Sequence, residues 1–113
     1  MDAKRATVKI GFDGTRLYAD IAGEIDHYTA AAVREQIDGQ MFRLHPRVLV
    51  MRLDGVTFMD SSGLGLVVGR LRVARELGSE LRITGADRQK MRIFSLAGLE
   101  RMPGLKIEQA SGL

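Results

Sequence analysis

The 113-residue chain has no cysteine, few aromatic residues and no long hydrophobic run. Without cysteine, disulfides, thiolate metal sites and cysteine nucleophiles are excluded, and a reducing compartment suits the chain. No apolar stretch approaches the ~18 residues of a membrane span, and the N-terminal segment lacks the apolar core of a signal peptide. We therefore expect a soluble, cytoplasmic protein with no membrane partner.

The chain also lacks a strong excess of one charge. It carries 17 Lys and Arg against 14 Asp and Glu, which gives a net charge of +3 with neutral histidines. The basic residues are interleaved with acidic ones, and aromatic residues make up only 5% of the chain, which leaves few platforms for stacking bases. We expect no direct nucleic-acid binding, whereas an acidic protein partner would use the same charges.

The first half of the chain predicts a hairpin, a helix and a buried strand. Alternating residues at 8–12 and 17–21 flank Asp13-Gly14, a strong hairpin signal. A helical stripe then runs from 29 to 44, although Gly39 weakens that helix by about 1 kcal/mol. The apolar run 48–53 is typical of a strand covered on both faces. We interpret Asp54-Gly55 as the turn that ends this strand.

The second half continues the alternation of strand and helix. A 3.6-residue repeat predicts a helix ending at Gly78, with one apolar stripe: Leu64, Val67, Val68, Leu71, Ala74 and Leu77. Strands follow at 80–84 and 105–107, separated by a helix that Asp87 caps and Gly98 ends. The order ββαβαβαβ predicts a single α/β domain over residues 1–113, with a mixed sheet that opens with an antiparallel hairpin and continues with parallel strands.

The segment 58–65, Phe-Met-Asp-Ser-Ser-Gly-Leu-Gly, joins the buried strand to the second helix. We expect Ser61 or Ser62 to cap this helix, because a capping hydroxyl accepts a hydrogen bond from a free backbone N–H. The same helix end attracts anions, so a phosphate there would be tolerated. Gly65 and Gly69 follow at i, i+4. We expect them to allow close approach to the sheet or a neighbouring helix, or to form a flat patch for a partner.

Candidate enzymatic chemistries lack the residues that they need. A nucleophilic serine needs a base, and His27 is within possible reach, but Asp60-Ser61-Ser62-Gly63 is not the Gly-x-Ser-x-Gly elbow of hydrolases. No Walker-type phosphate loop is present. The opening hairpin also argues against an all-parallel receiver domain.

Metal binding has equally weak support. Asp26 with His27, or Asp54 with Asp60, would supply two ligands, and no third follows at motif spacing. We therefore expect no metal, no cofactor and no catalytic residue. The remaining chemistry is modification of Ser61, where a phosphate would add about −1.5 to −2 charges.

Three segments in register resemble one known family. Residues 60–65, Asp-Ser-Ser-Gly-Leu-Gly, combined with 23–30, Gly-Glu-Ile-Asp-His-Tyr-Thr-Ala, and with 96–99, Leu-Ala-Gly-Leu, are similar to the STAS-domain anti-sigma factor antagonists, and most closely to the sporulation-type antagonist. The resemblance covers roughly residues 8–108 and implies the STAS fold.

The resemblance implies a regulator rather than an enzyme. In that family the serine directly after the motif's Asp is phosphorylated by an anti-sigma factor kinase. The resemblance therefore implies that Ser61 is the phosphate acceptor. The unphosphorylated form would bind that kinase and free its sigma factor, phosphorylation would end this activity, and a protein phosphatase would restore the unphosphorylated form. The residues expected at the partner-binding surface are Asp26, His27, Asp60, Ser61, Ser62, Gly63 and Leu64.

Two departures from the family limit this transfer. The chain stops about where the family's C-terminal helix would begin, so that helix is expected to be missing, and the basic charge balance is unusual for the family. The alternative function is a STAS-like interaction module of a transport or stress-signalling complex, without a switch, in which Ser61 only caps the helix.

Overall fold

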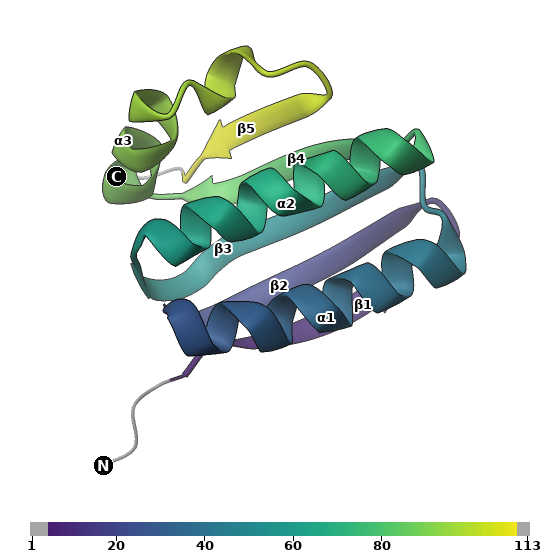
Figure 1. Ribbon diagram of the computed structural model, residues 1–113, viewed down its shortest axis with the longest axis horizontal. Coiled ribbons are helices and arrows are strands. Elements are labelled where there is room, and N and C mark those ends of the chain that lie inside the picture. The colour runs from purple at the N-terminus through teal and green to yellow at the C-terminus, as the bar shows by residue number, and fades with distance from the viewer. Residues whose placement is uncertain (1–4, 111–113) are drawn as a thin grey trace.

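The computed structural model describes residues 5–110, which form one mixed sheet with helices packed on it (Figure 1). The elements in chain order are β1 (Thr7–Phe12), β2 (Arg16–Ile25), α1 (His27–Leu44), β3 (Val48–Met59), α2 (Ser61–Leu77), β4 (Glu80–Ala86), α3 (Arg88–Leu96), the 3-10 turn η1 (Leu99–Arg101) and β5 (Leu105–Gln109). This order confirms the predicted ββαβαβαβ arrangement.

The five strands lie side by side in the order β1-β2-β3-β4-β5. β1 and β2 are antiparallel, and every later pair is parallel because a helix connects its two strands. The hairpin turn is confirmed: the Asp13 carboxylate accepts hydrogen bonds from the backbone N–H of Thr15 at 2.9 Å and of Arg16 at 2.7 Å. Gly14 has a φ of +96°, a conformation that favours glycine.

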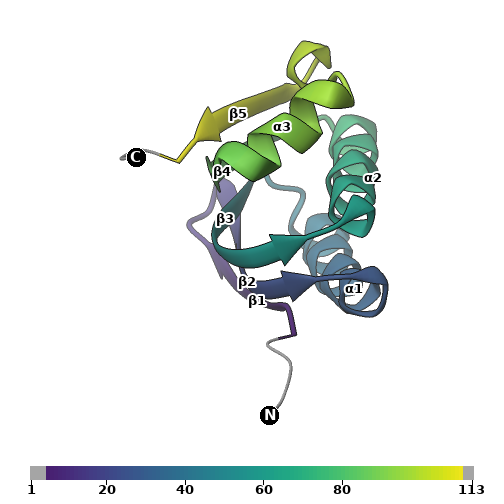
Figure 2. The same cartoon turned by 90° about the vertical axis from the view of Figure 1, so that its left-hand side faces the viewer.

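Helices α1 and α2 lie next to each other on one face of the sheet, whereas α3 lies toward the β4 and β5 end (Figures 1 and 2). The core forms between α1, α2 and the inward residues of the strands. The buried residues of α1 are Thr29, Val33, Ile37 and Met41. Fully burying a large apolar side chain such as Val33, Ile37 or Met41 contributes about 1.5–3 kcal/mol.

One sequence-based prediction about β3 is wrong. Asp54-Gly55 is not a turn, because β3 continues through it to Met59 and Gly55 pairs with Ala22 of β2. A Cβ at Gly55 would lie 2.9 Å from the Ala22 Cβ, so glycine permits this close pairing. In α2 the predicted Val67, Leu71 and Ala74 are buried, and the predicted Leu64, Val68 and Leu77 are half-buried against the core. The prediction did not include three further buried residues of this helix: Gly63, Leu66 and Arg70.

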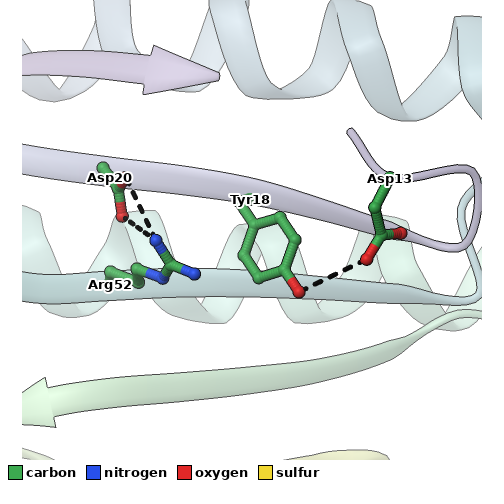
Figure 3. A network of polar contacts seen from close by, with 4 residues as sticks. All are labelled: Asp13, Tyr18, Asp20 and Arg52. Carbon is green, nitrogen blue, oxygen red and sulfur yellow. Dashed lines mark hydrogen bonds and ion pairs between the residues drawn. The ribbon is translucent and has the colours of Figure 1, made fainter. Parts of the chain in front are cut away.

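The opposite face of the sheet carries a polar network (Figure 3). Arg52 Nη1 lies 3.3 Å from both carboxylate oxygens of Asp20, and its guanidinium carbon lies 4.4 Å from the centre of the Tyr18 ring. The Tyr18 hydroxyl donates a hydrogen bond to Asp13 Oδ2 at 3.4 Å. The ion pair is almost half exposed, so it contributes about 0–1 kcal/mol.

The C-terminal part ends on an edge strand. Asp87 caps α3 as predicted: its Oδ1 accepts from the backbone N–H of Lys90 at 3.0 Å, and its Oδ2 pairs with Lys90 Nζ at 2.8 Å. Phe94 of α3 is buried, whereas Ala97, which follows the helix, is exposed. Within residues 5–110 no helix follows β5, and none of the helices described there is long and apolar enough to cross a membrane.

Candidate functional site

The two main motifs of the sequence meet at one edge of the sheet. β2 and β3 are parallel neighbours that end together, with Ile25 beside Met59. The Asp60 backbone N–H donates a hydrogen bond to the Ile25 carbonyl at 3.4 Å. The start of α1 therefore lies next to the start of α2 (Figure 1), and Asp26 and Asp60 lie at the same edge.

Asp60, and neither serine, caps α2, which corrects the sequence-based expectation. Asp60 has an extended backbone with φ −102° and ψ −163°, and its Oδ1 accepts from the Ser62 backbone N–H at 2.8 Å. The Gly63 backbone N–H donates to the Asp60 carbonyl at 2.9 Å. Asp and Ser are comparably good caps, so local sequence did not decide between them.

As a result, Ser61 is the first residue of α2 and is exposed, whereas Ser62 is half-buried. Among the described residues, neither serine hydroxyl takes part in a side-chain hydrogen bond that would hold it in the fold. The Ser61 hydroxyl is thus accessible to a modifying enzyme. A phosphate on it would lie at the positive end of the α2 dipole, which stabilises an anion by about 0.3–1 kcal/mol.

Gly63 allows the first turn of α2 to pack closely against Met59. It is buried, and a Cβ there would overlap Met59 Cγ and lie 2.5 Å from Met59 Sδ. Met59 is itself only 2% exposed, so it has little room to move. The glycine thus lets α2 begin directly over Met59. Leu64 is half-buried behind it.

Asp26 holds the start of α1. Its Oδ1 accepts from the backbone N–H of Tyr28 at 3.0 Å and of Thr29 at 2.9 Å, while Thr29 Oγ1 accepts from the Asp26 N–H at 2.9 Å. This reciprocal capping box fixes the loop that joins β2 to α1. The hydrogen bond from the Thr29 N–H is the main cause that lowers the pKa of Asp26 from its usual value. The carboxylate therefore stays charged beside Asp60.

Sequence reasoning missed two exposed aromatic residues at this edge. Tyr28 is 83% exposed and Phe58 is 46% exposed, although both have large apolar rings. His27 is also exposed, and its ring meets the Tyr28 ring edge-on at 5.5 Å. Exposed aromatic side chains are enriched where proteins bind partners. Their positions directly beside the two motifs were the available signal.

Gly65 and Gly69 do not contact the sheet or a neighbouring helix closely. A Cβ at either position would meet no atom within 4 Å, so the expectation of close approach is wrong. Both glycines instead line a groove between α1 and α2, together with Ser62 and His27. The alternative prediction, a flat patch for a partner, remains open.

Among residues 5–110 no group of three or more His, Asp or Glu side chains is arranged to hold a metal ion. Asp26 and His27 have no third ligand, and Asp54 lies inside β3 rather than in a loop. This edge therefore carries an exposed serine, two capping carboxylates and two exposed aromatic rings.

Residues 9–112 match the family described as the STAS domain. The chain belongs to the STAS domain family. It is 34% identical over 83 residues to the anti-sigma F factor antagonist of Paenibacillus polymyxa, covering 74% of this chain and 71% of the relative. It is 36% identical over 88 residues to the anti-sigma-B factor antagonist of Listeria monocytogenes, covering 76% and 75%.

A solved structure shows the same fold. The anti-sigma factor antagonist SpoIIAA in its unphosphorylated form superimposes with a TM-score of 0.76 at 22% identity, over 89% of this chain and 87% of that one. This STAS domain therefore has the predicted architecture, and the resemblance identified from the three sequence segments is confirmed at the level of the family.

Proposed function

We propose that this STAS domain is an anti-sigma factor antagonist controlled by phosphorylation of Ser61. The unphosphorylated form binds an anti-sigma factor that is also a serine kinase, and the kinase then releases its sigma factor. Phosphorylation ends the binding, and a phosphatase restores it. The observation that carries this proposal is the position of Ser61, exposed at the first residue of α2 while Asp60 supplies the cap.

In this mechanism the chain is a substrate and supplies only its hydroxyl. The Ser61 Oγ attacks the γ-phosphorus of ATP held by the kinase, the bond to the bridging oxygen breaks, and the hydroxyl proton leaves to a base of the kinase. ADP is the leaving group. The chain needs no base of its own, which agrees with the absence of a hydrogen-bonded partner for the Ser61 hydroxyl among the described residues.

The switch requires that the free protein tolerate the phosphate and that the complex does not. In the free protein the α2 dipole stabilises the phosphate and solvent surrounds it. In a complex whose interface covers Ser61, Tyr28 and Phe58, the phosphate would lose its water without gaining a cationic or hydrogen-bonding partner. It would also stand beside the carboxylates of Asp26 and Asp60, which adds like-charge repulsion.

The identity of the cap argues against the alternative of a non-switching module. In a non-switching module Ser61 would serve only as a helix cap, but Asp60 already accepts the Ser62 N–H. The relatives named above are also called anti-sigma factor antagonists rather than transport subunits.

The test is phosphorylation by anti-sigma factor kinases encoded in the same genome. The chain is incubated with each purified kinase and ATP, and the modified site is mapped by mass spectrometry. We expect one added phosphate on Ser61, lost in Ser61→Ala and retained in the matched control Ser62→Ala. Incorporation that survives Ser61→Ala, or none with any of these kinases, would refute the proposal.

A further inference from the structure

A groove runs between α1 and α2 on the outer side of the helical layer, beside the Ser61 edge. It has a volume of about 380 Å³ and begins near His27 and Ser62 at the first turns of the two helices. Its walls are low because small residues line it: Ala30, Ala31, Gly65 and Gly69. The helices α1 and α2 that line it lie side by side (Figure 1).

The charged residues that line this groove are all basic. Arg34 of α1 and Arg70 and Arg72 of α2 line it, and no Asp or Glu of the described residues does so. Arg34 and Arg72 are exposed, whereas the Arg70 side chain is only 5% exposed. The hollow on the opposite sheet face differs, because both basic and acidic side chains line it, Glu100 and Glu108 among them.

Arg70 is the buried part of the groove and is incompletely paired. Its Nε lies 2.8 Å from Asp38 Oδ1, but the two atoms are not aligned for a hydrogen bond. Its Nη1 is buried and has no hydrogen-bond partner among the described residues. A buried donor without an acceptor is costly in a folded protein. In the free domain the Arg70 Nη1 donor, at the floor of the groove, therefore lacks a hydrogen-bond acceptor.

The charges of Arg34 and Arg72 act on the guanidinium group of Arg70. Burial is the main cause that lowers the pKa of Arg70, Asp38 opposes it, and the charges of Arg34 and Arg72 lower it further. Arg34 also acts on Asp38, whose pKa burial raises. Asp38 therefore interacts with Arg70 and Arg34, and no carboxylate of the described residues lines the groove itself. A second anionic group from outside would relieve this repulsion.

We propose that this arginine groove, defined by Arg34, Arg70 and Arg72, receives an acidic segment of the anti-sigma factor kinase. Arginine pairs with carboxylates through two parallel hydrogen bonds, and the small residues let a partner helix or strand approach closely. The inference rests on the proposed function and adds the chemistry of the partner. It also strengthens the switch, because a phosphate on Ser61 would stand beside the partner's carboxylates and repel them.

The groove is tested with three variants that change the net charge equally. Arg34→Glu and Arg72→Glu reverse the two exposed groove charges, and Arg47→Glu is the control on the loop before β3, where the side chain is also exposed. Each purified variant is checked for native circular dichroism. Its association with the kinase that phosphorylates the wild-type chain is then measured at about 0.05 M and about 0.5 M salt, because salt screens exposed charges.

We expect each groove variant to reduce the association constant about tenfold or more at low salt, since like charges across an interface are strongly unfavourable. The loss should shrink at high salt, and Arg47→Glu should stay within about twofold of the wild type by the same reasoning. Equal behaviour of the three variants would overturn the groove inference while Ser61 phosphorylation still supported the proposed function. Failure of every kinase to bind the wild-type chain would overturn both.

Discussion

Asp60 Oδ1 accepts a hydrogen bond from the backbone N–H of Ser62 at 2.8 Å, and this contact frees Ser61 from any capping role. The carboxylate fixes the start of α2, and the exposed hydroxyl follows one residue later. Modification of Ser61 can therefore change the surface without removing the contact that holds the helix. This separation of tasks between adjacent residues is the structural basis of the proposed switch.

Removal of the cap should weaken the fold more than removal of the hydroxyl. Asp60→Ala should lower the free energy of unfolding by about 1 kcal/mol, within a usual range of about 0.5–2 kcal/mol for a lost cap. Urea denaturation of both variants measures this difference. Asp60→Asn keeps an accepting oxygen and serves as the control. If Ser61→Ala destabilised the domain as much as Asp60→Ala, our assignment of the cap would be wrong.

Two glycines of α2 should respond in opposite directions to alanine. Gly63→Ala places a methyl group against buried Met59 and should cost about 1–3 kcal/mol of stability, the usual price of overpacking. Gly65→Ala adds a methyl group in open space and should stabilise the helix by about 0.5–1 kcal/mol. Thermal or urea unfolding compares the two variants.

The same pair separates packing from binding. Because Gly65 lines the arginine groove, Gly65→Ala should weaken kinase binding although it stabilises the free domain. A parallel rise in stability and in affinity would show that the groove floor does not contact the partner.

Acid should destabilise the domain through its capping carboxylates. Hydrogen bonds lower the folded-state pKa values of Asp13 and Asp26, and the Lys90 side chain lowers that of Asp87. A carboxyl with a lowered pKa contributes stability that is present above its unfolded pKa of about 3.9 and is lost as the pH falls through the folded value. Asp38, whose pKa is raised by burial, contributes with the opposite sign.

Stability measured by urea denaturation should therefore fall progressively below about pH 5. Asp26→Asn retains a capping side chain but cannot titrate, so its stability should fall less steeply over the same range. If the stability of Asp26→Asn fell as steeply with pH as that of the wild type, Asp26 would not contribute to the acid sensitivity of the domain.

Much of the fold was predictable because its signals are local. Asp13-Gly14 forms the predicted hairpin turn, Asp87 caps the start of α3, and Gly98 follows the residue that caps its end. Asp54-Gly55 carries a similar turn signal, yet β3 continues through it because pairing with β2 outweighs the local preference. That pairing depends on residues about 30 positions away, which no local pattern reports.

The candidate site was predictable in its position but not in its roles. The order of strands and helices places Asp26 and Ser61 at the same edge, because carboxyl ends of parallel strands meet there. The choice between Asp60 and the serines as cap depends on backbone angles. The arginine groove depends on which faces of α1 and α2 meet, and the predicted apolar stripe of α2 did not include Arg70, which is buried there.

The most direct test of the central claim compares the affinity of one kinase for the unmodified chain and for the chain phosphorylated on Ser61. Calorimetry without ATP gives both dissociation constants, and circular dichroism checks that both forms are folded. We predict that the phosphorylated form is folded and binds at least about tenfold more weakly, since a desolvated phosphate facing like charges costs more than the ~1.4 kcal/mol of a tenfold change. Equal affinities of the two forms would contradict the account.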